Sequence, residues 1–362
     1  MKHGTCRGTA RGGYRAIVVA LAALLTLCAS CPSLAESRDT VRIAGSAWVG
    51  DAPTWVADRQ GLFNRGRPDD APVIEVDLHG SGLEALMHLL AGEAQFALSA
   101  TTPTAMALVG AFDDSGPGSS ALVVLGSVAL SNQSHYVIAP SRNGIDSPRD
   151  LAGRRVGVMF GTSSHYGWSR FGRFHGLEAA GIELIDTPVA EMAEALQRGD
   201  LDAAVIWQPW DLALREALDG AVTILPMRML YTVNWLLLST REFVAEQPAV
   251  VERVLRGYID AIDMIDAEPE STLALHAEAT GRDGADLVTS AANMLWRLGM
   301  NWSVLVNLGT QFEWLATWPQ FDALTIPEPG QYLDGAPLRE VAPGRVTLPD
   351  YLLTSGHRET RP

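Results

Sequence analysis

Three hydroxyl side chains stand together where an apolar stretch gives way to a polar, aromatic one. Residues 154–160 have the pattern of a strand, and Gly161 is followed by Thr162, Ser163 and Ser164 at the start of a helical pattern. A helix N-terminus has unpaired backbone N–H groups and about half a positive charge. Hydroxyls at this junction can therefore cap the helix or help to bind an anion. Capping is the simpler interpretation of Ser163.

Similar residues follow the other predicted strands, and arginine and lysine are scarce there. Hydroxyls and helix N-termini make a neutral polar cradle, and tryptophan supplies flat apolar walls, which suits a small ligand with an oxyanion head. Asp51 would repel that head and could instead pair with an ammonium group at the far end of the ligand. Ser81 and Thr102 are predicted as helix caps in any case. The strand-end residues are Ser46, Trp48, Asp51, His79, Ser81, Ser99, Thr101, Thr102, Ser131, Ser134, Thr187, Trp207 and Trp210.

The sequence contains none of three common enzyme motifs. There is no G-x-S-x-G, GxxxxGK[ST] or H-E-x-x-H pattern. His165 and His175 are ten residues apart, which is not a usual zinc-ligand spacing, and His79 and His88 are scattered. All three cysteines lie in the first 31 residues. We therefore predict no catalytic residue, no metal and no cofactor.

The first 35 residues have the pattern of a secretory signal peptide. Basic residues precede an apolar run over residues 16–29, and Ser33 and Ala35 stand at −3 and −1 to a cut after Ala35. A lipoprotein anchored through Cys31 is the alternative, although Cys28 stands where an aliphatic residue is expected. Cleavage removes four basic residues and changes the formal charge from −15 to −19. This charge disfavours nucleic acid and anionic membranes as partners, and the segment predicts a periplasmic location.

Strand-like and helix-like runs alternate in two blocks, residues 41–128 and 137–225. The alternation predicts parallel α/β units. Residues 241–318 are expected to be helical, without strands of their own, and to pack on the first block. The second block is then an insertion with two crossings, which makes a hinge and a cleft between two lobes. The predicted boundaries are 36–130 and 231–325 for lobe 1, 131–230 for lobe 2, and 326–362 for an irregular tail.

Four stretches, in this order, resemble the substrate-binding proteins of ATP-binding cassette (ABC) importers of the nitrate/sulfonate/taurine type. They are WVGDAPTWVADRQGLF, VDLHGSGLEALMHLLAGEAQFALS, DLAGRRVGVMFGTSSHY and VAEMAEALQRGDLDAAVIWQPW. The resemblance covers about residues 42–239, with a looser fit to about residue 338. It departs at Asp51, where the family often has an aromatic residue nearby, and at Gln95, where it usually has an acid.

This resemblance implies a two-lobed α/β protein that closes on a small solute and delivers it to a membrane permease. Family ligands include nitrate, bicarbonate, taurine, alkanesulfonates and pyrimidine vitamin precursors. We expect taurine or another organosulfonate, because the loops are rich in hydroxyls and poor in arginine and Asp51 could pair with an amine. The ligand-binding residues that the resemblance implies are Trp48, Asp51, Ser81, Thr101, Thr102, Thr162, Ser163, Ser164, Trp207 and Asn234.

Two other functions stay open at this point. An enzyme of the pyrimidine-synthase branch has the same fold, but that branch carries a cysteine-rich motif and works inside the cell. The cysteine-free mature chain and the signal peptide both disfavour it. A sensing subunit that presents its solute to a membrane receptor is the second alternative. For the binding protein we expect a monomer.

Overall fold

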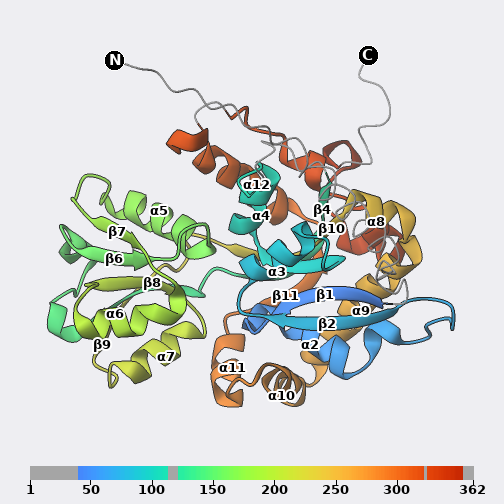
Figure 1. The fold of residues 1–362 in the computed structure, drawn as a ribbon, viewed down its shortest axis with the longest axis horizontal. Helices are drawn as coiled ribbons and strands as arrows, with labels where there is room; N and C mark the ends of the chain where they lie inside the picture. Colours follow the sequence, from blue (N-terminus) through green and yellow to red (C-terminus); the bar gives the residue numbers. More distant parts are fainter. Residues whose placement is uncertain (1–39, 113–120, 322–323, 354–362) are drawn as a thin grey trace, which may run out of the picture. The chain divides into compact units, whose positions relative to one another are not determined.

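The computed structural model describes residues 40–112, 121–321 and 324–353 as two β-sheets with helices on their faces (Figure 1). The predicted signal peptide, residues 1–35, and the alternative anchor Cys31 lie outside these described residues. Within them, no helix is both long enough and apolar enough to cross a membrane.

The first sheet has six strands in the order β11-β4-β10-β3-β1-β2. β1 is parallel to β2 and β3, whereas β10 is antiparallel to β3 and β4, and β11 is antiparallel to β4. The central strands are almost entirely buried, which explains their continuous runs of Val, Leu and Ala. The strands are β1 (Thr40–Ser46), β2 (Val73–His79), β3 (Phe96–Ala100), β4 (Leu122–Ser131), β10 (Val233–Thr240) and β11 (Leu295–Gly299).

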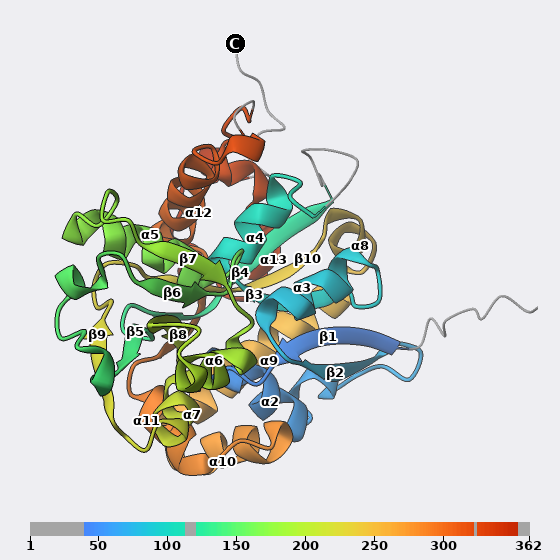
Figure 2. The same cartoon turned by 60° about the vertical axis from the view of Figure 1, so that its left-hand side comes forward.

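The second sheet has five strands in the order β7-β6-β8-β5-β9. β6 is parallel to β7 and β8, and β5 is antiparallel to β8 and β9. Its two faces are packed by separate apolar clusters. Trp168 and Phe171 of α5 cover one face, and Leu196 of α6 and Leu214 of α7 cover the other (Figure 2). The strands are β5 (His135–Pro140), β6 (Arg155–Val158), β7 (Glu183–Asp186), β8 (Ala203–Trp207) and β9 (Val222–Pro226).

The helices divide between the sheets as the strands do. Those beside the five-stranded sheet are α5 (Ser163–His175), α6 (Met192–Arg198) and α7 (Trp210–Ala217). Those beside the six-stranded sheet are α2 (Ala52–Arg59), α3 (Gly82–Leu90), α4 (Thr101–Leu108), α8 (Arg241–Glu246), α9 (Pro248–Ala267), α10 (Pro269–Thr280), α11 (Gly284–Ala291), α12 (Trp302–Leu315) and α13 (Ala336–Val341).

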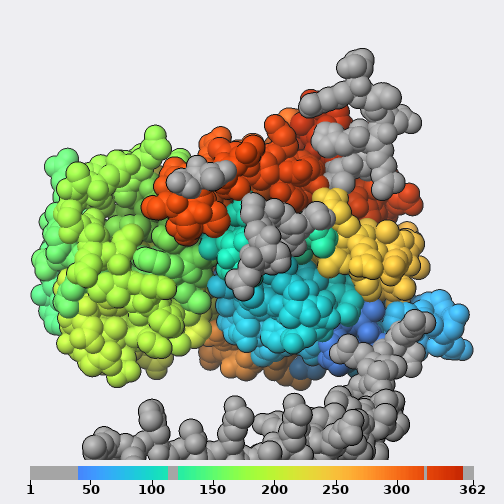
Figure 3. All heavy atoms as spheres, turned by 45° about the horizontal axis from the view of Figure 1, so that its top comes forward, coloured from blue at the N-terminus to red at the C-terminus, as the bar shows by residue number. Residues whose placement is uncertain are grey.

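Two segments connect the sheets. Residues 132–134 lead from β4 into β5, and residues 227–232 lead from β9 into β10. An aromatic contact also joins them, since His165 and Tyr166 of α5 lie 5.1 and 5.2 Å, ring centre to ring centre, from Trp314 of α12. Figure 3 shows the orange-red surface of α12 against the green surface of the five-stranded part. The two crossings predicted from the sequence are thus present.

Three details of the prediction were wrong. Residues 241–318 do contain a strand, β11, whose residues alternate between exposed and buried before Gly299. That short period-two pattern is hidden inside a longer apolar stretch. β5, β9, β10 and β11 run antiparallel to neighbours, so neither sheet is purely parallel. Beyond residue 326, helix α13 forms, and Leu333, Leu338 and Leu353 are fully buried.

Candidate ligand-binding site

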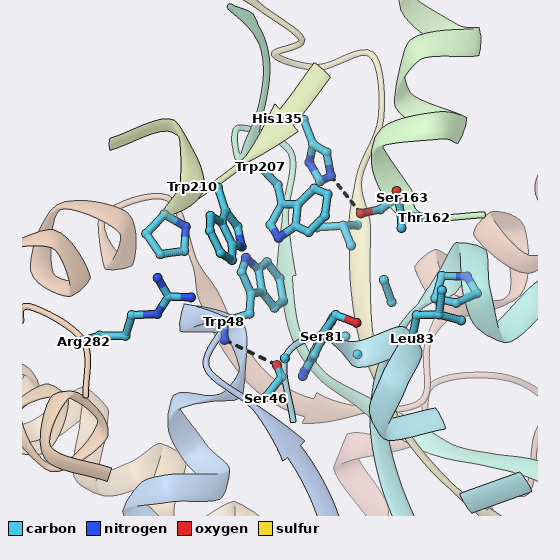
Figure 4. Close-up of a pocket in the computed structure, with 17 residues that line it drawn as sticks. Ser46, Trp48, Ser81, Leu83, His135, Thr162, Ser163, Trp207, Trp210 and Arg282 are labelled. Carbon is cyan, nitrogen blue, oxygen red and sulfur yellow. Dashed lines mark hydrogen bonds between the residues drawn. The ribbon is translucent and has the colours of Figure 1, made fainter. Parts of the chain in front are cut away.

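A cavity of about 590 Å³, including its open mouth, is lined by loops from both sheets (Figure 4). The loops follow β1, β2 and β3 in the first sheet, and β6 and β8 in the second. The starts of β5 and β10 and the turn between α10 and α11 complete it. Its lining residues are Ser46, Trp48, Gly80, Ser81, Gly82, Leu83, Ala100, Pro103, His135, Thr162, Ser163, Trp207, Pro209, Trp210, Val233, Trp235 and Arg282.

Half of the ten predicted ligand-binding residues line this cavity. They are Trp48, Ser81, Thr162, Ser163 and Trp207. The other five are fully buried and do not line it, namely Asp51, Thr101, Thr102, Ser164 and Asn234. The local patterns therefore placed the right loops at the cavity but did not distinguish which side chains of each loop face it.

The N-terminus of α5 lacks a side-chain cap. Thr162 is the N-cap residue, yet its hydroxyl donates to the carbonyl of Met159 at 2.6 Å and lies 2.9 Å from the hydroxyl of Ser164. Ser163 is the first helical residue, so its predicted capping role was wrong, as was that of Thr102 inside α4. An uncapped helix N-terminus at a cavity leaves backbone N–H groups and positive potential for an anion.

Ser81, in contrast, is a true cap. Its side chain accepts a hydrogen bond from the N–H of Glu84 at 3.2 Å, as predicted. Ser81 also lines the cavity, so the capping and lining roles coincide in this residue.

Ser163 belongs to a buried hydrogen-bonded chain that the sequence did not reveal. Its Oγ lies 2.9 Å from Nε2 of His135, and Nδ1 of His135 lies 3.0 Å from the hydroxyl of Ser134. Burial lowers the pKa of His135 to about 3, so the imidazole is neutral. If Ser134 donates to Nδ1, then Nε2–H donates to Ser163, and the hydroxyl of Ser163 is left to donate to a ligand. His135 and Ser163 are 28 positions apart, so no local motif joins them.

Tryptophans form the walls of the cavity. Trp48 and Trp235 pack together with ring centres 4.5 Å apart, whereas Trp207 is the last residue of β8 and Trp210 the first residue of α7. Trp48 is only 7% exposed, and its Nε1 has no hydrogen-bond partner among the described residues. A buried indole N–H without a partner is costly, and an acceptor atom on a ligand would satisfy it.

Arg282 supplies the cation that the strand-end loops lack. It lies in the turn after α10, and its guanidinium is 5.1 Å from the ring centre of Trp210, so the contact joins the two sides of the cavity. In the described part of the chain no carboxylate lies within salt-bridge distance of Arg282. Burial lowers its pKa from the ordinary value, but an arginine stays charged at neutral pH.

Asp51 is fully buried and does not line the cavity. Its carboxylate accepts hydrogen bonds from the N–H of Ser46 at 2.5 Å and from the hydroxyl of Thr54 at 2.6 Å. Burial raises its pKa to about 6. These contacts hold the loop after β1, in which Ser46 and Trp48 line the cavity. No acidic residue is among the described lining residues.

Two of the other buried residues, Thr101 and Asn234, connect the start of β10 to neighbouring helices. The hydroxyl of Thr101 donates to the carbonyl of Asn234 at 3.3 Å, and the side chain of Asn234 is 3.0 Å from the hydroxyl of Ser303. These bonds fix the start of β10 against α4 and α12. Thr101 and Asn234 therefore hold elements that line the cavity but do not line it themselves.

Outside the cavity, two histidines come together that the sequence analysis treated as scattered. The rings of His79 and His88 lie 4.1 Å apart, centre to centre. His79 ends β2, and the chain then turns into α3, whose second turn carries His88 back over it. The spacing of nine residues did not predict this contact, because it spans a strand-to-helix turn rather than one helix.

Comparison with known proteins finds a family model and several relatives that match parts of this chain. A family model described as NMT1/THI5 like matches residues 67–272. A candidate binding protein of Brucella abortus (strain 2308) is 28% identical over 179 residues, which are 49% of this chain and 54% of that protein. The chain thus spans about half the length of these Brucella relatives. The taurine-binding periplasmic protein of Escherichia coli (strain K12) is 23% identical over 261 residues, covering 70% of this chain and 75% of that protein.

Solved structures agree on the architecture. The alkanesulfonate-binding protein SsuA from Xanthomonas axonopodis pv. citri, bound to MOPS, superposes with a TM-score of 0.65 at 19% identity. The superposition covers 80% of this chain and 95% of that protein. The two-lobed periplasmic binding protein fold predicted from the sequence is therefore confirmed.

Proposed function

The chain belongs to the NMT1/THI5-like family, and we propose that it is the solute-binding component of an ABC importer. In this proposal, lobe 1 (residues 36–130 and 231–325) and lobe 2 (131–230) close on a small organic anion outside the cytoplasm. The closed, monomeric protein then delivers the anion to a membrane permease. The observation that carries the proposal is the cavity itself, which combines an uncapped helix N-terminus, Arg282 and tryptophan walls.

The cavity favours an anion with an apolar body, such as an alkane- or arenesulfonate. The N–H groups of α5 and the hydroxyl of Ser163 would bind the sulfonate oxygens. Arg282, which Figure 4 shows on the far side of Trp210 from Ser163, would add positive potential at the other end of the cavity. Trp48 and Trp207 would cover the carbon chain or ring. Taurine fits less well, because its ammonium group would enter a cavity whose described lining contains no carboxylate.

The alternatives gain less support from the same residues. Nitrate and bicarbonate are too small to cover the tryptophan walls. A pyrimidine precursor would stack on those walls, but it would leave Arg282 without an anionic partner. For an enzyme of the same fold, the described lining offers no thiol nucleophile, since all three cysteines precede residue 40. We therefore propose binding without catalysis.

A melting-temperature screen tests this assignment. Short alkanesulfonates, benzenesulfonate, taurine, nitrate, bicarbonate and a hydroxymethylpyrimidine are added separately at saturating concentration. A ligand that binds only the folded state stabilises it by about 3 kcal/mol at a hundred times its Kd, which gives a clear rise in Tm. We expect the sulfonates with apolar bodies to give the largest rise. A rise with the pyrimidine alone, or with none of the anions, would refute the proposal.

Arg282→Gln is expected to weaken sulfonate binding about fivefold, because it removes a positive charge from the cavity lining, and a charge that acts without a direct hydrogen bond contributes roughly 1 kcal/mol. The matched control is Arg256→Gln on α9, which removes an exposed arginine that pairs with Glu252 at 2.8 Å. Isothermal titration calorimetry of both variants measures the effect. Equal affinity in Arg282→Gln and the wild type would show that the charge of Arg282 does not contribute to anion binding.

A further inference from the structure

Beside the cavity, three potential metal ligands converge where β2 meets α3. One ligand atom each from His79, Glu84 and His88 lies within 4.8 Å of the other two. His79 is the last residue of β2, whereas Glu84 and His88 are one helical turn apart on α3. Glu84 and His88 therefore share a face of the helix, and the strand end brings His79 to it. Two imidazoles and one carboxylate are a ligand set that Zn²⁺ commonly takes.

The surroundings of these residues suit a metal in two ways. Nδ1 of His88 lies 2.5 Å from a carboxylate oxygen of Glu93, which orients the ring and leaves Nε2 for a metal. One carboxylate oxygen of Glu84 accepts a hydrogen bond from the N–H of Gly80 at 2.8 Å, so its second oxygen can turn toward a metal. The two glutamates also make the local charge negative, which attracts a cation.

The two imidazoles also lie close together. The ring centres of His79 and His88 are 4.1 Å apart, with an angle of 36° between the ring planes, so both rings are within reach of a single ion. Around one zinc ion, ligand atoms lie about 3–4 Å apart, given bond lengths of about 2.0–2.2 Å. Small rotations of these partly exposed side chains would reach that separation.

We propose that His79, Glu84 and His88 bind Zn²⁺, or another divalent transition metal of similar preference, with water in the fourth position. Such a metal would link the end of β2 to α3. The enclosed segment contains Gly80 and Ser81, which line the cavity. The metal would thus fix one wall of the cavity without contacting its ligand, and the inference does not depend on which solute binds.

Zinc titration of the full protein, purified without a histidine tag, tests the site. We expect Zn²⁺ to raise Tm saturably and with one equivalent, and Mg²⁺ to have no such effect, because Mg²⁺ prefers oxygen ligands. His79→Gln and His88→Gln should each abolish the rise. Glu93→Gln should weaken zinc affinity about tenfold or more, because it removes only the group that orients His88.

The controls make the outcome decisive. His175→Gln removes a histidine at the end of α5, remote from the site in sequence and on the other sheet, and should leave the zinc effect unchanged. Glu84 is exposed, so Glu84→Gln should fold normally and still weaken zinc binding. Calorimetry and the visible absorption of Co²⁺-loaded protein report coordination without relying on stability. No binding of Zn²⁺, or binding that survives both histidine substitutions, would overturn the proposal.

Discussion

Gly82→Ala is expected to destabilise the protein and weaken ligand binding, although alanine is the better helix former. Gly82 is the first residue of α3 and lines the cavity. A Cβ atom there would overlap with the ring carbon Cη2 of Trp235 and lie 3.1 Å from the backbone Cα of Ser99. Trp235 cannot retreat freely, because its ring packs on Trp48. Overpacking of this kind costs about 1–3 kcal/mol, and the displaced indole would change the cavity wall.

Gly172→Ala, in contrast, should stabilise the protein. Gly172 lies inside α5, and apart from the nearby backbone of that helix no atom is within 4 Å of the position that a Cβ would take. Replacing a helix-interior glycine with alanine stabilises by roughly 0.5–1 kcal/mol. Urea denaturation of both variants, with calorimetry of ligand binding, measures the contrast. If Gly82→Ala were as stable as Gly172→Ala and bound ligand normally, the packing described for Trp235 would be wrong.

Lowering the pH from about 7 to about 5 is expected to cost roughly 3–4 kcal/mol of the free energy of unfolding. Burial lowers the pKa of His135 to about 3 and those of His165 and His276 to about 4, against an ordinary value of 6.5. The folded state therefore binds fewer protons than the unfolded state below pH 6.5, and its stability falls as the pH falls. Asp51 has the opposite effect on stability. Because its pKa is raised to about 6, the folded state takes up this proton at a higher pH than the unfolded state does, which adds stability as the pH falls.

A substitution separates this effect from general acid sensitivity. His276 is fully buried between other elements of the first lobe, and His276→Leu removes one of the three protonation sites. The slope of unfolding free energy against pH should then fall by about 1.4 kcal/mol per pH unit near pH 5. Urea denaturation at several pH values measures the slope. An unchanged slope would mean that His276 is not held neutral by the fold.

The sequence predicted best what depends on neighbouring residues. The strand-to-helix junctions at Ser81 and at Thr162-Ser163 were found because strand pattern, turn and helix pattern follow one another within a few residues. Parallel strands then bring such junctions to one edge of a sheet. The order of four such strand-to-helix units along the chain also predicted the fold.

What it missed depends on contacts between distant residues. Arg282 reaches the cavity from a turn that has no strand before it, and Trp235 lies in a strand that looked like ordinary core. Asp51 stands in the right loop, but the direction of its carboxylate is decided by the buried N–H of Ser46 and hydroxyl of Thr54. Side chains in a loop do not alternate with a fixed period, as those in a strand do. The sequence alone could therefore not show which side chains of a loop face the cavity.

The most direct test of the central claim compares two ligands of nearly equal shape. Taurine and 1-propanesulfonate differ only in an ammonium group in place of a methyl group. If the cavity binds an anion with an apolar body, calorimetry should show 1-propanesulfonate binding about tenfold tighter or more, because the ammonium group would be buried without a partner. Tighter binding of taurine would contradict the account, since it would mean that the cavity provides a partner for the ammonium group, such as a tryptophan face, and not only an apolar wall.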